Sequence, residues 1–152
     1  MSMVIVTIAG ASAILFVGYC VPLVALSFYC LMIKRIKFIG IPVLNQDRAL
    51  AFYTEKLGFK VFTDQAFNEK QRWIELTIPG AATSVVLFTP EGQEDRVGTF
   101  LNSSWEVDDV VKTFQDLSSK GVEFAGPPQD QPWGTFVIMK DSEGNSICLA
   151  GK

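Results

Sequence analysis

An internal repeat constrains the fold of this chain more than any other feature of its sequence. In the stretch 43–61, apolar residues recur at spacings of three and four, which is the pattern of one helix face. Gly58 follows the last of them, where a left-handed helix end favours a residue without a side chain. Strand-like alternation begins at Phe59. The same order recurs over 105–124, with Gly121 at the helix end.

Each copy of this order is preceded by a short apolar strand and followed by two further strand-like runs. The sequence therefore predicts an α+β fold built from two βαβββ modules. The first helix should be capped by Asn45 or Asp47, and the second should run from about Asp108 to Ser119. The apolar stripe of the first helix consists of Ala49, Phe52, Tyr53 and Leu57.

Alternation and turn residues place the remaining elements. We expect strands at Ile36–Val43, Lys60–Thr63, Arg72–Ile78, Ser84–Thr89, Thr99–Val107, from Val122 onward, Gly134–Lys140 and Asn145–Ala150. We expect loops at Asp64–Lys70, Pro90–Val97 and Ala125–Pro132.

Residues 1–33 form an apolar segment that differs from these modules. No charged side chain occurs over 4–33, and a membrane helix needs only about 20 apolar residues. The basic run that begins at Lys34 would then mark the cytoplasmic side. The alternative is that residues 1–31 precede the true start at Met32. Both interpretations remain open, and both leave residues 34–152 as one domain in the cytoplasm or at the inner face of a membrane.

Composition argues against several classes of function. The net charge is −3, and basic residues cluster only after the apolar segment, so we expect no nucleic-acid partner. Histidine is absent, which removes the most common general base and the most common metal ligand. The three cysteines lack C-x-x-C spacing and are expected to be buried thiols in a reducing compartment.

Both modules carry recognisable motifs at caps, turns and core positions. These are Asp47-Arg48-Ala49, Phe52-Tyr53, Leu57-Gly58-Phe59, Asp108-Asp109-Val110, Lys120-Gly121-Val122 and Asp141-x-x-Gly144-Asn145. Together they resemble the vicinal oxygen chelate superfamily, which includes glyoxalase I, bleomycin-resistance proteins, fosfomycin-resistance proteins and extradiol dioxygenases. The resemblance extends from about Lys34 to Leu149. It implies that the two modules form one open, cup-shaped mixed sheet, and that the chain forms homodimers.

Metal-using members of that superfamily place four ligands inside the cup, on the first and fourth strands of each module. When each of the four ligand positions is matched to this sequence, the residues found there are Phe38, Val86, Asn102 and Cys148. One thiol and one amide do not form the ligand set that zinc or a hard divalent cation needs. The resemblance therefore implies a metal-free member, and we expect no cofactor.

Alternation also defines the side chains that face the cup, if the helix-facing sides of the strands are the apolar ones. The candidate ligand-binding residues are Phe38, Trp73, Glu75, Val86, Asn102, Ser104, Phe136 and Cys148, with Trp133 at the mouth; Thr77, Ser84, Phe88 and Ile138 share their faces. Aromatic rings with a few polar groups suit a flat, partly apolar organic ligand. Any one of these rings could equally belong to the core.

Glu75 is the candidate catalytic residue, because a carboxylate on a central strand is costly unless it is paired. It could form a salt bridge to Arg72 or Arg96, or it could act as a general acid or base. Cys148 has no histidine to activate it, so a catalytic thiolate is not expected.

Three hypotheses follow from these residues. The first is a small-molecule-binding protein that holds an organic ligand in the cup and protects by sequestration. The second is a lyase, similar to lactoylglutathione lyase, or an isomerase that works through Glu75. The third is a structural or interaction module without a ligand.

Overall fold

The computed structural model describes residues 4–8, 11–15 and 33–151. The chain divides into two units, Met1–Lys34 and Arg35–Lys152. In the first unit, β1 (Val4–Ile8) and β2 (Ala11–Leu15) pair as an antiparallel hairpin. A membrane helix over 4–33 was one of the two open interpretations. The described strands β1 and β2 are not helical, and residues 16–32 lie outside the described residues. None of the helices in the described parts has the length and hydropathy that a membrane crossing requires.

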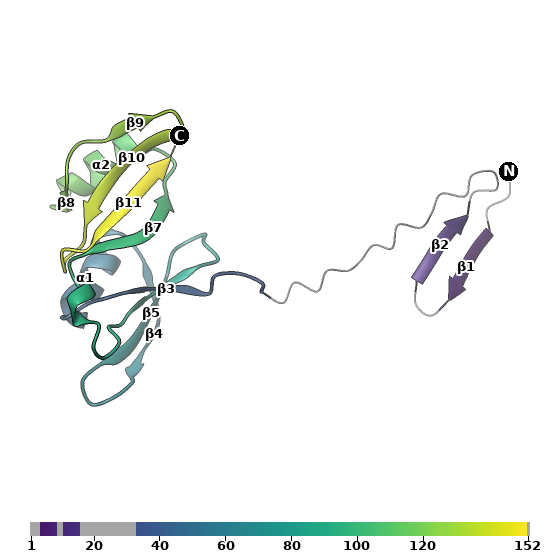
Figure 1. Cartoon of the computed structure of the whole chain (residues 1–152), viewed down its shortest axis with the longest axis horizontal. Helices are drawn as coiled ribbons and strands as arrows, with labels where there is room; N and C mark the ends of the chain where they lie inside the picture. Colours follow the sequence, from purple (N-terminus) through teal and green to yellow (C-terminus); the bar gives the residue numbers. More distant parts are fainter. Residues whose placement is uncertain (1–3, 9–10, 16–32, 152) are drawn as a thin grey trace. The chain divides into compact units, whose positions relative to one another are not determined.

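The first module is built from one helical segment and four strands (Figure 1). In chain order these are β3 (Phe38–Ile41), α1 (Gln46–Ala51), the π-helix η1 (Phe52–Lys56), β4 (Lys60–Ala66), β5 (Arg72–Thr77) and β6 (Ser84–Leu87). The sheet order is β3-β6-β5-β4. The edge strand β3 is parallel to β6, and the other pairs are antiparallel.

The second module repeats this topology after a short 3₁₀ helix, η2 (Glu94–Arg96). Its elements are β7 (Phe100–Glu106), α2 (Val110–Ser119), β8 (Glu123–Phe124), β9 (Gln129–Gln131), β10 (Gly134–Lys140) and β11 (Ser146–Gly151). The sheet order is β7-β11-β10-β8, with β7 parallel to β11 and the short β9 paired to β10. Position by position, this matches the first module and confirms the two βαβββ units.

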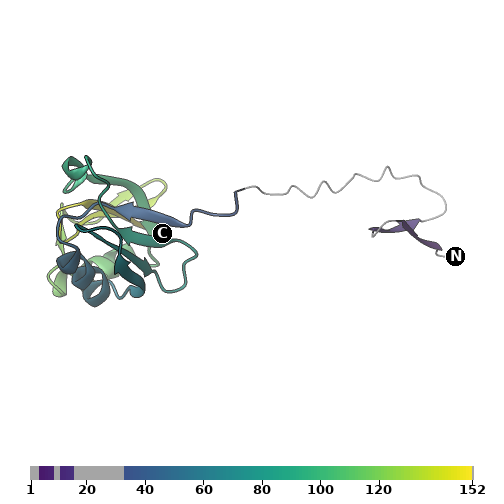
Figure 2. The same ribbon diagram turned by 90° about the horizontal axis from the view of Figure 1, so that it is seen from below.

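The expectation of one continuous sheet is wrong. The strands of the described residues form separate sheets for the two modules, because the backbone ladders stop at the edge strands. A single hydrophobic core joins the modules instead, and it includes buried residues of both sheets. Figure 2 shows α1 and α2 together on one side of the sheets. The ends of the two helical segments touch, because Lys56 Nζ donates to Gly121 O at 3.1 Å and Lys120 Nζ donates to Lys56 O at 3.2 Å.

Local signals in the sequence position the helices. Asn45 caps α1 by accepting a hydrogen bond from the backbone N–H of Arg48, and Asp109 caps α2 in the same way. Gly58 and Gly121 both have left-handed backbones, with φ of 76° and 73°. The expected cap at Asn45 and the two glycine helix ends are confirmed. The π-helical turn η1 between α1 and Gly58 was not expected.

Two predicted loops contain strand residues. β4 continues to Ala66 through part of the expected loop Asp64–Lys70, and it carries a bulge between Val61 and Thr63. β9 forms within the expected loop Ala125–Pro132. The alternation predicted for β5 is confirmed, because Ile74 and Leu76 are fully buried against the helices.

Candidate functional site

Each sheet presents one face to the helices and one face that carries no helix. The common core lies on the helix side of both sheets, so the alternate residues of each strand belong to the opposite, helix-free face. In the first sheet these residues are Phe38, Gly40, Thr63, Trp73, Glu75, Thr77, Ser84 and Val86. In the second sheet they are Phe100, Asn102, Ser104, Glu106, Phe136, Ile138 and Cys148.

The helix-free face of the first sheet carries four contacting aromatic side chains, which we call the aromatic cluster. Its members are Phe38, Phe67, Trp73 and Phe88. The Trp73 ring lies 5.4 Å from that of Phe38, 5.9 Å from that of Phe67 and 5.7 Å from that of Phe88. Phe38 is 38% exposed and Phe67 is 56% exposed. Rings that pack on one another and still face solvent differ from core residues, which this fold buries almost completely.

Two rings of this cluster cover a row of residues that crosses the sheet. The strand register aligns the row in the order Gly40, Val86, Glu75 and Thr63. Phe38 on β3 and Trp73 on β5 lie on opposite sides of this row. Their rings meet edge to face over the row, on the helix-free side of the sheet. This cover explains why Val86 is only 1% exposed and Glu75 only 7% exposed on a face without helices.

Glu75 lacks the ion pair that the sequence suggested. Arg72 pairs instead with Asp47 and, at 3.5 Å, with Asp64. Arg96 donates to the side chain of Gln93 at 3.0 Å. Among the described residues, no side chain forms a salt bridge or hydrogen bond with the Glu75 carboxylate. The expectation of a salt bridge to Arg72 or Arg96 is therefore wrong.

The helix-free face of the second sheet is more polar. Asn102 and Ser104 alternate along β7, and Ser104 Oγ lies 3.6 Å from Cys148 Sγ on β11. Trp133, in the turn before β10, stacks on Phe136 with ring centres 5.6 Å apart and remains 65% exposed. This face could contact an aromatic ring at Trp133 and polar groups at Asn102 and Ser104.

The four positions that correspond to metal ligands in the resemblance divide between the sheets. Phe38 and Val86 lie on the helix-free face of the first sheet, and Asn102 and Cys148 lie on that of the second. Within the described parts of the chain, no three His, Cys, Asp or Glu side chains gather closely enough to hold a metal ion.

Sequence reasoning missed two residues of the first face. Phe67 lies in the predicted loop just after β4, in phase with Thr63 and Gln65, but it was not counted among the residues that face the cup. Gly40 follows Phe38 on the same face, and its lack of a side chain leaves open space beside Val86.

A buried polar network joins the two modules. Its residues belong to the motifs found in the sequence, but the sequence did not predict that they contact one another. Asp141, in the turn between β10 and β11, accepts hydrogen bonds from the Tyr53 hydroxyl at 2.7 Å and from the Asn145 amide at 2.8 Å. The Asn145 amide also donates to Pro42 O in the first module. Burial raises the pKa of Tyr53 well above its ordinary value, and the charge of Asp141 adds to this effect. This network is structural, because it links the modules on the helix side.

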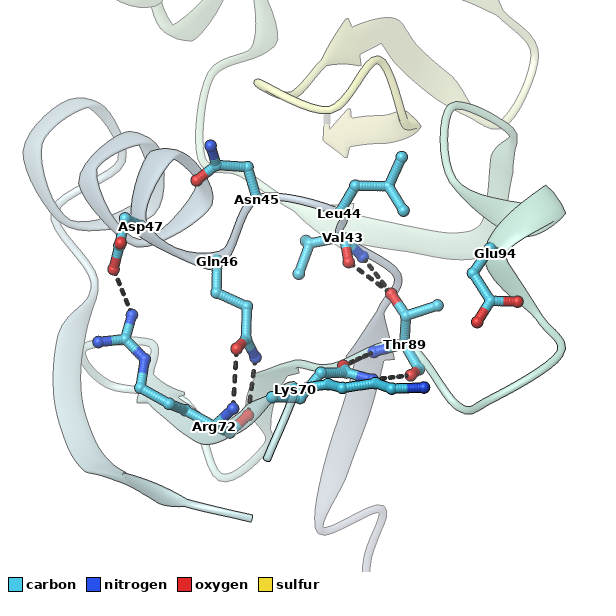
Figure 3. Close-up of a pocket in the computed structure, with 10 residues that line it drawn as sticks. Val43, Leu44, Asn45, Gln46, Asp47, Lys70, Arg72, Thr89 and Glu94 are labelled. Atoms are coloured by element: carbon cyan, nitrogen blue, oxygen red, sulfur yellow. Dashed lines mark hydrogen bonds and ion pairs between the residues drawn. The ribbon is translucent and has the colours of Figure 1, made fainter. Parts of the chain in front are cut away.

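A pocket of about 440 Å³ lies beside the start of α1, and Figure 3 shows the residues that line it. Several of its polar side chains already serve the fold. Gln46 bridges the backbone N–H and C=O of Arg72, and Thr89 Oγ1 both accepts from and donates to the backbone of Val43. Because these groups are committed to the fold, the aromatic helix-free face is the stronger candidate site.

Comparison with known proteins identifies the family. The model of the Glyoxalase/Bleomycin resistance protein/Dioxygenase superfamily matches residues 35–149. The chain belongs to this superfamily. The family resemblance drawn from the sequence motifs is thereby confirmed.

Relatives of this superfamily match the chain almost over their full length. The uncharacterized protein YetH of Bacillus subtilis (strain 168) is 34% identical over 121 residues, which is 78% of this chain and 98% of YetH. A superfamily member from Sphaerobacter thermophilus DSM 20745 superposes with a TM-score of 0.73 at 30% identity, covering 80% of this chain and 100% of its own. TnmS3, an antibiotic binding protein from Streptomyces sp. CB03234, has a TM-score of 0.68 at 30% identity, covering 79% and 97%.

Proposed function

We propose that this superfamily member binds a small aromatic organic molecule on the helix-free faces of its two modules. The aromatic cluster is the observation that carries the proposal. Four rings contact one another on a face that packs against no helix, and two of them remain well exposed. Flat ligands gain both area burial and ring–ring contacts on such a surface.

The antibiotic-binding relative supports this proposal. TnmS3 shares the fold and 30% of its residues with the chain. Sequestration of an antibiotic needs only a complementary surface, whereas a reaction also needs positioned acid, base or metal groups. We therefore propose that the protein protects by binding and holding a toxic aromatic compound.

We further propose that binding uses neither a metal ion nor a cofactor. The support comes from the chemistry of the side chains at the family's four ligand positions. Phe38 and Val86 offer no donor atom, and Asn102 offers only a neutral amide. Cys148 alone cannot complete a coordination sphere.

Fluorescence titration tests the binding proposal, because Trp73 lies at the proposed site. We expect at least one compound from a panel of polycyclic aromatic antibiotics to change the tryptophan emission saturably. Trp73→Ala should weaken this binding by roughly tenfold, measured by calorimetry, through the loss of ring contact. Val111→Ala, an exposed change on α2, should leave the affinity unchanged. Equal affinity in all three proteins would contradict the assignment, and a panel without binders would favour the module without a ligand.

An enzyme remains the second candidate, and Glu75 is the observation that favours it. A shielded carboxylate without a partner among the described residues could accept or donate a proton. The test is to follow thioester formation from methylglyoxal and glutathione. Activity that Glu75→Gln abolishes would establish a lactoylglutathione-lyase-like reaction, and absence of turnover would leave binding as the function.

We also propose that the protein is a homodimer, as the family resemblance implies. Phe67, Phe100 and Trp133 are each more than half exposed in the single chain. Apolar surface of this kind is typical of an interface or a binding groove. Sedimentation equilibrium should give twice the chain mass of 16.8 kDa, and a concentration-independent monomer would contradict the dimer.

A further inference from the structure

Glu75 places a carboxylate on the face that a bound ligand would cover. Its side chain lies on a central strand, 7% exposed and flanked on its own strand by Trp73 and Thr77. Across the sheet its neighbours are Val86 and Thr63. The carboxylate oxygens are not among the fully buried polar atoms that lack a partner, so water reaches them. A ligand that covers this face removes that water, and the carboxylate is then costly unless a cation or several hydrogen-bond donors compensate it. Within the described residues, no such group contacts it.

The nearest cation by strand register does not supply this compensation. Lys60 pairs with Thr77 in the ladder and therefore belongs to the same face. It forms no ion pair with Glu75, and Lys60 itself is exposed. The face thus combines one uncompensated negative charge with aromatic rings that attract cations through their π-systems.

From this combination we infer that Glu75 anchors the ligand, and that the ligand is an aromatic cation. The inference rests on the proposed function and specifies the ligand class of that site. The positively charged nitrogen binds the Glu75 carboxylate, and the aromatic body packs against Phe38 and Trp73.

The row that crosses the sheet also sets the size of the aromatic body. Gly40 is exposed, and a Cβ atom built on it would meet no atom within 4 Å. Gly40 and Glu75 lie two strands apart, which corresponds to about 10 Å. This span is comparable to the length of a three-ring fused aromatic molecule. A ligand along the row replaces the edge contact between Phe38 and Trp73 with its own ring contacts.

A matched pair of probes separates charge from shape. 9-Aminoacridine and acridine share one three-ring skeleton, and at about pH 8 the first is a cation and the second is neutral. Calorimetry on the full chain should show roughly tenfold tighter binding of 9-aminoacridine. In Glu75→Gln this ratio should fall to about one, while the affinity for acridine stays within roughly twofold of wild type.

Two further variants make the test specific to this carboxylate. Glu55→Gln removes the same charge at an exposed site on η1 and should keep the tenfold preference. Glu91→Gln removes a carboxylate from an exposed turn outside both sheets and should also keep it. Melting curves identify any variant that fails to fold, and Glu75→Asp then serves as a second substitution, which should retain the preference for the cation.

The outcomes distinguish this inference from the proposed function. Equal binding of both probes by the wild type, or a preference that survives in Glu75→Gln, overturns the anchor role and leaves the aromatic site intact. A preference lost in Glu55→Gln or Glu91→Gln shows that overall charge rather than Glu75 sets it, and also overturns the anchor role. If neither probe binds, the aromatic site itself is refuted for three-ring ligands, and the inference falls with it.

Discussion

At the scale of single residues, Tyr53 shows how one hydroxyl connects the two modules. Its side chain is fully buried in the first module, and its hydroxyl donates to Asp141 in the second. The carboxylate of Asp141 also accepts hydrogen bonds from the Asn145 side-chain amide and from the backbone N–H groups of Glu143 and Asn145. A phenol in this position is held in its neutral, donating form.

Tyr53→Phe should therefore destabilise the protein by about 1–2 kcal/mol at neutral pH, because the buried acceptor loses one donor. The pH dependence should also change. The unfolded tyrosine releases its proton near pH 10, whereas the pKa in the folded protein is raised, so stability falls as pH rises above about 10. Urea unfolding between about pH 8 and 11 measures both effects. Parallel pH profiles for wild type and Tyr53→Phe would contradict this account.

Gly58 provides a test that involves backbone conformation alone. Its φ is 76°, and a Cβ atom at this position would meet nothing within 4 Å. Gly58→Ala should thus cost about 1 kcal/mol through the left-handed conformation rather than through a clash. Gly126 also has open space around it but no left-handed φ, so Gly126→Ala is the matched control and should be near neutral. A difference in melting temperature between the two variants measures the effect, and identical values would refute it.

At the scale of elements, the turn between β10 and β11 fastens the start of α1. Glu143 Oε2 accepts hydrogen bonds from the backbone N–H groups of Leu44 and Asn45, at 2.8 and 3.2 Å. Its other oxygen pairs with Arg48 at 2.7 Å. The side chain of Glu143 is 1% exposed, whereas that of Arg48 is 57% exposed, so only the carboxylate side of this contact is shielded from water. The turn thus connects modules that share no backbone ladder in the described sheets.

Glu143→Ala should cost about 2–4 kcal/mol, because two backbone donors and one arginine lose a charged acceptor. Glu91 is exposed and forms no hydrogen bond or ion pair within the described part of the chain, so Glu91→Ala should change stability by less than about 0.5 kcal/mol. Chemical unfolding of the two variants provides the comparison. A loss below about 1 kcal/mol for Glu143→Ala would show that the core alone holds the modules together.

The sequence predicted those structural elements whose conformation is set by residues close together in the chain. Asn45, Gly58 and Gly121 act through their own backbone and first neighbours, so their roles as cap and helix ends could be predicted. The bulge in β4 depends on pairing with β5, which lies further along the chain. Phe67 does lie in the loop after β4, as predicted, but its contacts with Trp73 and Phe88 depend on that pairing, so it was missed as a member of the aromatic cluster.

Among the candidate site residues, too, local features could be predicted and tertiary contacts could not. Alternation along β5 placed Trp73 and Glu75 on one face correctly, because a strand fixes side-chain direction with period two. The partners of Glu75 could not be predicted, since Arg72 pairs with Asp47 and Asp64 through tertiary contacts that sequence spacing does not encode. The functional roles of these residues stay predictions.

At the scale of the whole molecule, the two modules share one hydrophobic core and form one compact unit over Arg35–Lys152. Residues 1–34 form a separate unit. A domain with its own core should fold independently of a neighbouring segment.

A chain that begins at Met32 should therefore fold and stay in solution, with the melting temperature that the domain has in the full chain. Circular dichroism and light scattering test this. Aggregation of the shorter chain, together with good behaviour of the full chain in detergent, would favour the interpretation of residues 4–33 as a membrane anchor.

The location of the bound ligand tests the central claim most directly. Backbone amide chemical shifts, recorded while the tightest-binding aromatic compound is titrated into the labelled full chain, report that location. We expect the largest changes on the helix-free face of the first sheet, at Gly40, Glu75 and Val86, with smaller changes at Trp133. Changes confined to the polar pocket around Gln46 would contradict the proposed site.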